Sequence, residues 1–409
     1  MDVKELFNGI AVIIDDEINN PNSSIRNILK QIEDNAMPCV KYDELPDSSV
    51  IKHLRNAAFV LLDWKLDADK EISNETFEGV KLPETINADN DEKNIHFLKD
   101  LQSKCFCPIF IFTNENVEAI KEKLRNNGLY RKGKCSIFLI KSKSDFTNEG
   151  SLFSELENWI KETAPIYLLK EWDNAYQCAK SNLFIDFQKR SPYWTKALWD
   201  TYIDDNVNPS LEFSEFLMKS IQTQIQPLEL DATIFEASSK LEDPRELAAC
   251  LERQCYIDAA FLDSDIPCTG DIFDVNNNVY INIRPCCDLI PRDDTPQQND
   301  INLYLIKGER IKKPSKIKEF YHSKYGLIDN ESCFKVYPVC NGYLINFKFQ
   351  DIFIKKWGEV KNTRKGRLLP PFLTKLQMKY GSYLQRQGLP KLPKESIIID
   401  DVSTSTDNH

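Results

Sequence analysis

Five short apolar segments in the first third of the chain constrain the fold more than any other feature. Each is bounded by polar turn residues, and segments with helical periodicity separate them. The expected strands are residues 10–14, 38–42, 57–63, 108–113 and 136–141, and the expected helices are residues 22–34, 48–56, 94–104, 116–127 and 150–162. Short apolar strands that alternate with helices predict a doubly wound α/β domain, in which a five-stranded parallel sheet is covered on both faces.

The rest of the chain changes pattern twice. Amphipathic helical spacing is followed by short strands with Asn and Gly turns, which are typical of a small β-barrel or sandwich. Residues 365–387 are expected to form a basic amphipathic helix that Pro370 and Pro371 begin. The predicted divisions are an α/β domain over residues 1–163, a helical connector over 164–250, a β-rich α+β C-terminal module over 251–394 and a disordered tail over 395–409.

Residues 66–94 interrupt the α/β rhythm. They contain nine acidic residues, three lysines and little periodicity. Such a composition buries little apolar surface, so we expect a long acidic loop inserted directly after the third strand.

The net charge of −11 hides an asymmetry between the two ends of the chain. Residues 307–394 contain 20 Lys and Arg but only 6 Asp and Glu. Aromatic residues lie among these lysines, which suits contact with nucleic acid. A solvated basic face, or docking on the acidic half of the same chain, explains the same charge.

Several observations favour a cytoplasmic protein. No apolar run is long enough to span a membrane, and the first residues lack the basic-then-apolar pattern of a signal peptide. Twelve cysteines without such a signal favour free thiols in a reducing compartment. The pairs Cys105/Cys107 and Cys286/Cys287 lack the spacing of a structural zinc site, so we interpret them as buried thiols. A nucleophilic Cys287 beside Asp288 would lack a histidine nearby in the sequence.

Polar residues end four of the expected strands. The first strand leads into Asp15 and Asp16, the third ends at Asp63, the fourth at Thr113 and the fifth at Lys141. In a parallel sheet these ends meet at one edge, where ligands bind in open α/β folds. Clustered carboxylates repel one another unless a cation or a hydrogen-bond network lies among them.

Each of these residues also has a simpler interpretation. The three aspartates can be solvated acids at strand ends, and Thr113 can cap the helix that follows it. Lys141 taken alone would be a surface lysine, and Phe138 taken alone would be a core residue. The coincidence of the polar residues at successive strand ends favours a site.

The segments "IIDDE", "LLDWKL", "FIFTNEN" and "FLIKSKSD" resemble the receiver domain of response regulators, which is flavodoxin-like. The resemblance implies that Asp15, Asp16 and Asp63 hold Mg²⁺ and that Asp63 accepts a phosphoryl group from a histidine kinase. It implies that Thr113 and Lys141 contact the phosphoryl oxygens. Phe138, three residues before Lys141, matches the family's aromatic switch position.

Mg²⁺ prefers hard oxygen ligands and is commonly shared between carboxylates and a phosphate, which agrees with this set of residues. Lysine supplies a point charge for a phosphate. The transferred group needs positioning and charge neutralisation, so the domain is a phosphoacceptor at most, rather than an enzyme of a classical kind.

The whole chain also resembles a divergent class of receiver proteins found in bacterial defence loci, often beside a histidine-kinase-like ATPase. The segments "GRLLPPFLTKLQMKYGSYLQRQGLP" and "GDIF…CCDL" carry this resemblance. It implies a cytoplasmic signalling protein whose phosphorylated receiver controls the C-terminal module, with that ATPase or another protein as partner.

Two alternatives remain open. Ser142 follows Lys141 where the family usually has a cis-proline, and the acidic insertion follows Asp63 directly. Both features favour a pseudo-receiver that binds a protein partner without phosphotransfer. The charge of residues 307–394 favours instead a C-terminal effector that binds nucleic acid.

Overall fold

The structure is a computed structural model that describes most of the chain. The described residues are 3–66, 84–130, 136–146, 148, 150–205, 207–237, 244–291, 297–312, 329–330, 333–336 and 344–386. The predicted tail over 395–409 therefore lies outside them. The chain divides into two compact units, which are described separately: Met1–Thr201 with Ser210–Lys240, and Tyr202–Pro209 with Leu241–His409.

The first unit is built on an all-parallel five-stranded sheet in the order β2-β1-β3-β4-β5. The strands are β1 (Ile10–Ile14), β2 (Cys39–Tyr42), β3 (Ala57–Leu62), β4 (Ile109–Thr113) and β5 (Phe138–Ser142). The predicted parallel α/β sheet is therefore confirmed, with strand ends within two residues of the expected ones.

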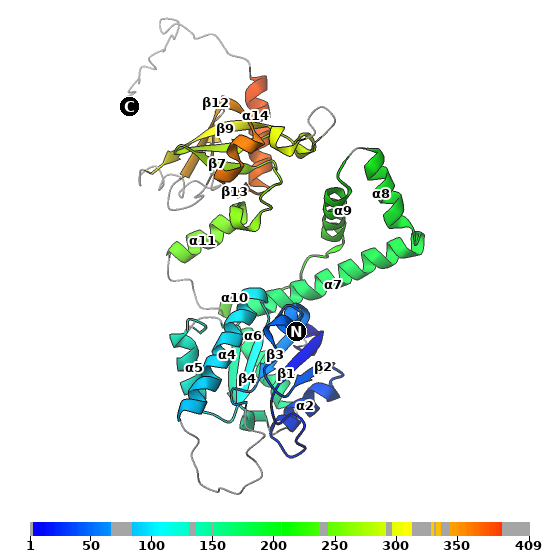
Figure 1. The fold of residues 1–409 in the computed structure, drawn as a ribbon, viewed down its shortest axis with the longest axis vertical. Helices are drawn as coiled ribbons and strands as arrows, with labels where there is room; N and C mark the ends of the chain where they lie inside the picture. The colour runs from blue at the N-terminus through cyan, green and yellow to red at the C-terminus, as the bar shows by residue number, and fades with distance from the viewer. Residues whose placement is uncertain are drawn as a thin grey trace, which may run out of the picture. The chain divides into compact units, whose positions relative to one another are not determined.

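Helices cover both faces of this sheet (Figure 1). They are α1 (Val3–Leu6), α2 (Ile25–Asp34), α3 (Ser48–Ile51), α4 (Glu84–Lys104), α5 (Val117–Asn126) and α6 (Ser151–Lys161). Successive side chains of a strand point to opposite faces. Accordingly Ile13 packs in the core that α1, α2 and α6 cover, whereas Ile14 packs in the core under α3, α4 and α5. Both cores are apolar, which accounts for the continuous apolar runs of the strands.

The acidic insertion is shorter than predicted. Helix α4 begins at Glu84, so the last part of residues 66–94 continues into the predicted helix over 94–104. Residues 67–83 lie outside the described residues. The expected helix over 48–56 is divided into α3 and a 3₁₀ turn, η1 (Leu54–Asn56).

Five helices of the described chain follow the α/β domain. They are α7 (Ala164–Arg190), α8 (Trp194–Asp204), α9 (Pro209–Gln224), α10 (Ala232–Ala237) and, in the second unit, α11 (Pro244–Cys255). A small core of Ala179, Leu183 and Ile221 joins α7 to α9. No helix among the described residues is long and apolar enough to cross a membrane.

The second unit contains one antiparallel sheet of eight described strands, in the order β10-β11-β12-β9-β8-β7-β13-β6. The strands are β6 (Tyr256–Asp258), β7 (Asp271–Val275), β8 (Asn278–Asn282), β9 (Asn302–Ile311), β10 (Asp329–Asn330), β11 (Cys333–Val336), β12 (Leu344–Lys356) and β13 (Arg364–Leu368). The expected barrel or sandwich is wrong, because the described strands form one sheet whose end strands, β10 and β6, do not pair with each other.

Short helices complete the second unit. They are α13 (Trp357–Val360), α14 (Phe372–Gln385), η3 (Ala259–Phe261), η4 (Cys286–Leu289), η5 (Gln298–Asp300) and η6 (Lys361–Thr363). The helix predicted over 365–387 is divided: its first residues form β13, and α14 begins after Pro371. Leu373 and Leu376 of α14 pack with Phe349 on one core of the sheet, and Trp357 lies in the other.

The turn that follows β5 is held from within the first core. This 3₁₀ turn, η2 (Lys143–Phe146), places the Phe146 ring against Phe112, with centroids 4.4 Å apart. Buried Gln31 of α2 donates through Nε2 to the Phe146 carbonyl at 3.4 Å and accepts from the Leu152 N–H through Oε1 at 2.9 Å. One side chain therefore anchors the last residue of η2 and the first turn of α6.

Replacement of this glutamine should destabilise the first unit. In Gln31→Ala the buried Leu152 N–H loses its acceptor, and an unpaired buried donor costs about 2 kcal/mol. Urea unfolding followed by circular dichroism measures the loss, and Gln188→Ala on the exposed surface of α7 is the matched control. Equal stability of the two variants would contradict the anchoring role.

Candidate functional site

The edge of the parallel sheet at the carboxyl ends of β1, β3 and β4 carries three buried polar side chains. Asp15 directly follows β1, Asp63 directly follows β3, and Thr113 is the last residue of β4. The Asp63 N–H donates to the Ile14 carbonyl at 2.8 Å, which continues the sheet ladder and places Asp63 beside Asp15. All three residues are at most 5% exposed, so their charges and dipoles act in a poorly screened environment.

The ammonium group at this edge belongs to Lys143 and not to Lys141. Its Nζ lies 2.6 Å from Asp63 Oδ2 and 2.7 Å from Asp15 Oδ2, and its side chain is buried. Lys141 lies within β5, and its Nζ instead forms an ion pair with Glu155 of α6 at 2.5 Å. The predicted placement of Lys141 is corrected for this reason.

The physical reason is the length of β5. The strand continues through Ser142, so Lys141 still points to one face of the sheet, the face that α6 covers. Lys143 is the first residue beyond the strand, as Asp15 and Asp63 are beyond theirs. The segment "FLIKSKSD" contains both lysines, and the expected strand end at 141 rather than 142 selected the wrong one.

Phe138 loses the basis on which it was chosen as a switch. Phe138 lies three residues before Lys141, whereas Ile140 lies three residues before Lys143. Phe138 is the first residue of β5, 3% exposed and packed in the core under α4 and α5 together with Ile140. Its placement agrees with the simpler interpretation of a core residue.

Asp16 completes a cluster of three carboxylates. Ligand atoms of Asp15, Asp16 and Asp63 lie within 4.8 Å of one another. Asp15 Oδ2 is buried without an aligned hydrogen-bond partner among the described residues, although it pairs with Lys143 by charge. Hard carboxylate oxygens at this separation could hold a divalent cation that prefers oxygen ligands.

The environment raises the pKa of both buried carboxyl groups. Burial raises the pKa of Asp63 to about 6, against the opposing effect of Lys143, and burial also raises the pKa of Asp15. Burial opposes the charge of Lys143, but Asp63 and Asp15 outweigh it and raise the pKa of this ammonium. Lys143 therefore remains charged, and it shares its charge between two carboxylates.

Thr113 does not cap the following helix. Its Oγ1 accepts the Glu115 N–H at 3.1 Å, whereas the cap of α5 is Asn116, whose Oδ1 accepts the N–H groups of Glu118 and Ala119. The hydroxyl thus keeps its own proton to donate, at the end of the strand next to β3 and β5.

Trp64, next to Asp63, is tied to two helices. Its Nε1 donates to Asp91 of α4 at 2.6 Å, and Asp91 also pairs with Lys123 of α5. Asn94 of α4 donates to the Trp64 carbonyl, and Asn90 donates to the Leu66 carbonyl at 3.2 Å. Residues 64–66 are therefore fixed by side chains from a single stretch of α4, a contact that no short motif in the sequence indicated.

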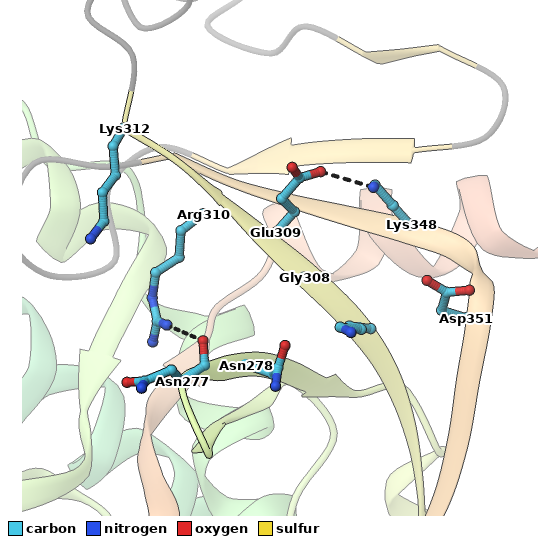
Figure 2. Close-up of a pocket in the computed structure, with 9 residues that line it drawn as sticks. Asn277, Asn278, Gly308, Glu309, Arg310, Lys312, Lys348 and Asp351 are labelled. Atoms are coloured by element: carbon cyan, nitrogen blue, oxygen red, sulfur yellow. Dashed lines mark hydrogen bonds and ion pairs between the residues drawn. The ribbon is translucent and has the colours of Figure 1, made fainter.

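A hollow lies on the sheet of the second unit (Figure 2). It has a volume of about 660 Å³, and its cationic lining comes from Lys307, Arg310, Lys312 and Lys348. Figure 2 shows Lys348 paired with Glu309, and Arg310 bonded to the Asn277 carbonyl. Arg310 also pairs with Asp274, and Asp351 lines the hollow, so carboxylates offset most of the positive charge here.

The cysteine predictions are confirmed for one pair and wrong for the other. Cys105 and Cys107 are buried free thiols, but Cys286 and Cys287 are exposed. Both lie in η4, a turn that follows β8 rather than a strand, which explains their exposure.

No protein-family model, curated protein or solved structure matches the chain. The interpretation of the site therefore depends on its geometry and on the resemblance of its motifs.

The buried Asp63 should make stability depend on pH. Its pKa of about 6 exceeds the ordinary value of 3.8, so the folded state binds the proton more tightly than the unfolded state does. The cost of burying the charge is present above pH 6 and is relieved as pH falls. Relative to that of Asp63→Asn, the free energy of unfolding of the wild type should rise by about 1.4 kcal/mol as the pH falls from about 7.5 to about 5.

Urea unfolding of both proteins in EDTA, at the two pH values, measures this difference. Asp145→Asn, which removes an exposed carboxyl two residues from Lys143, is the matched control and should show no such dependence. A pH-independent difference between wild type and Asp63→Asn would contradict the raised pKa.

The two lysines of "FLIKSKSD" should differ in their contribution to stability. Lys143→Met leaves two buried carboxylates without their cation and should lower the free energy of unfolding by about 3 kcal/mol without metal. Lys141→Met removes a half-exposed ion pair and should cost less than about 1 kcal/mol. Thermal unfolding in EDTA distinguishes the two variants, and equal losses would contradict the assignment of Lys143.

Proposed function

We propose that residues 1–163 form a receiver-type phosphoacceptor domain, in which Asp63 accepts a phosphoryl group with Mg²⁺ held by Asp15, Asp16 and Asp63. The observation that carries the proposal is the position of the Lys143 ammonium, 2.6 Å from Asp63 and 2.7 Å from Asp15 at the carboxyl edge of a parallel sheet. The cluster of three carboxylates within 4.8 Å adds a donor set that suits Mg²⁺.

The chemistry follows from the charges of the site. With a pKa of about 6, the Asp63 carboxyl is mostly ionised at neutral pH and available as a nucleophile. One of its oxygens would form the new bond to phosphorus as the bond from phosphorus to the donor breaks. Mg²⁺ would supply positive charge that balances the carboxylates and the phosphoryl oxygens. Lys143 and the Thr113 hydroxyl would contact those oxygens, as a cation and a hydrogen-bond donor.

The proposal extends to partners and output through the resemblance alone. The phosphodonor would be a phosphohistidine of a histidine-kinase-like ATPase, and the setting would be bacterial defence. Phosphorylation would change how the β-rich second unit docks on its partner.

Trp64 offers a direct test, because it adjoins Asp63 and is bonded to Asp91. Purified protein with Mg²⁺ and beryllofluoride, a phosphoryl mimic, should show a saturable change in tryptophan fluorescence. The change should require both reagents and vanish in Asp63→Asn. Lys143→Met should weaken apparent beryllofluoride affinity by about tenfold or more, because it removes a charge-assisted contact, whereas Lys141→Met should leave it unchanged.

Two controls complete this experiment. Trp64→Phe identifies the contribution of Trp64 among the six tryptophans. A response that persists in Asp63→Asn would contradict the assignment of the phosphoacceptor.

A second candidate, a pseudo-receiver that binds a protein without phosphotransfer, is favoured by one observation. Lys143 pairs with both Asp15 and Asp63, so the chain itself supplies a cation that offsets one of these two buried negative charges. Ser144 follows Lys143, so with either lysine a serine occupies the position of the family's cis-proline. Correctly folded protein with no Mg²⁺ affinity and no response to beryllofluoride would favour this candidate over the first.

The nucleic-acid interpretation of residues 307–394 stays a prediction with little support from the described residues. Two of the four cations that line the hollow on this surface, Arg310 and Lys348, are paired with carboxylates, which lowers its positive charge.

A further inference from the structure

Two thiols lie across the open end of the β7–β8 hairpin in the second unit. Strands β7 and β8 pair in an antiparallel register in which Ile272 faces Ile281, and the Gly270 N–H continues the ladder to the Asn282 carbonyl at 2.7 Å. If that register is extended beyond the open end of the hairpin, Cys268 lies opposite the segment that carries Cys286.

Side-chain contacts agree with the register. Cys286 lies close enough to Cys268 to raise the pKa of its thiol. Thr269 Oγ1 lies 3.1 Å from Cys286 Sγ and donates to the Arg284 carbonyl at 2.6 Å, which joins the two sides of the hairpin next to the thiols.

The backbone around Cys268 is fixed. Its N–H donates to Asp271 Oδ2 at 2.8 Å, and its carbonyl accepts from Asn282 Nδ2 at 3.1 Å. Gly270 has a φ of +88°, and a Cβ there would lie 2.6 Å from the Leu368 carbonyl, so only glycine fits this turn. The sulfur of Cys268 is therefore presented to Cys286 by a rigid turn.

We propose that Cys268 and Cys286 form an oxidisable dithiol site, which low-molecular-weight disulfides such as oxidised glutathione convert to an intramolecular disulfide. Cys286 is exposed and open to reagents, whereas Cys268 is half-buried. This arrangement is that of an attacking thiol beside a resolving thiol.

The exchange proceeds in two balanced steps. The Cys286 thiol loses its proton to solvent, its thiolate attacks one sulfur of oxidised glutathione, and one glutathione thiolate leaves. The Cys268 thiol then loses its proton and attacks Cys286 Sγ, and the second glutathione thiolate leaves as the new S–S bond forms. The two protein thiols are oxidised, and one molecule of oxidised glutathione is reduced to two thiols.

Neighbouring groups favour Cys286 over Cys287 as the partner. Cys287 Sγ donates to Asp288 Oδ1 at 3.5 Å. The nearby Cys286 and burial raise the pKa of Cys268, whereas the Arg367 guanidinium opposes this effect and favours a thiolate. Arg367 is itself held by Asp271, which also binds Arg364, so the disulfide would form beside a buried ion network.

The test uses the full chain equilibrated with glutathione redox buffers, quenched with acid and alkylated. Cleavage before Asp271, Asp274 and Asp288 places Cys268 and Cys286 on different peptides, so their linkage appears in mass spectrometry as one joined species that reductant separates. We expect this species in wild type and in Cys287→Ser, and its loss in Cys286→Ser and in Cys268→Ser.

Other outcomes would overturn the proposal. Glutathione adducts on Cys286 without a joined peptide would mean that Cys268 does not reach the adduct. A joined peptide that persists in Cys286→Ser and disappears in Cys287→Ser would show that Cys287, and not Cys286, is the partner of Cys268. Circular dichroism of each variant under reducing conditions verifies that the fold is retained. If a serine variant fails to fold, the single variants Cys268→Ala and Cys286→Ala repeat the test.

Discussion

One buried ammonium group organises the edge of the α/β sheet. Lys143 lies between Asp15 and Asp63, and burial alone would make either carboxylate costly to ionise at neutral pH. Lys143 can hold this position because its turn is anchored at a distance, by the Phe146 ring in the first core and by the two hydrogen bonds of Gln31. The position of the charged groups at this edge thus depends on packing in the first core.

The same arrangement has a different meaning in each of the two interpretations of the edge. A cation that enters the cluster must share Asp15 and Asp63 with Lys143, so metal binding and the internal ion pair compete for the same oxygens. If the protein is a working receiver, the lysine gives up part of its contact when the phosphoryl group arrives. If it is a pseudo-receiver, the lysine is the permanent occupant.

Much of this fold could be predicted from the sequence, because buried parallel strands appear as continuous apolar runs. The strand ends that bear Asp15, Asp63 and Thr113 followed from those runs. The choice between Lys141 and Lys143 could not, because it depends on whether β5 ends one residue earlier or later, and polar residues follow in either case. The barrel or sandwich expected for the second unit was wrong because strand number and turn composition do not specify whether a sheet closes.

Contacts between distant segments could not be predicted from the sequence for a related reason. Asn90, Asp91 and Asn94 fall in a stretch rich in polar residues, and their binding to Trp64 and Leu66 emerges only when α4 packs beside β3. These contacts hold Leu66, the last described residue before the acidic segment, against α4. The position of this junction is therefore set by α4. Since the entropy of closing a loop grows only slowly with its length, this junction is a point where evolution or an engineer can lengthen, shorten or exchange the segment while the neighbouring carboxylates keep their positions.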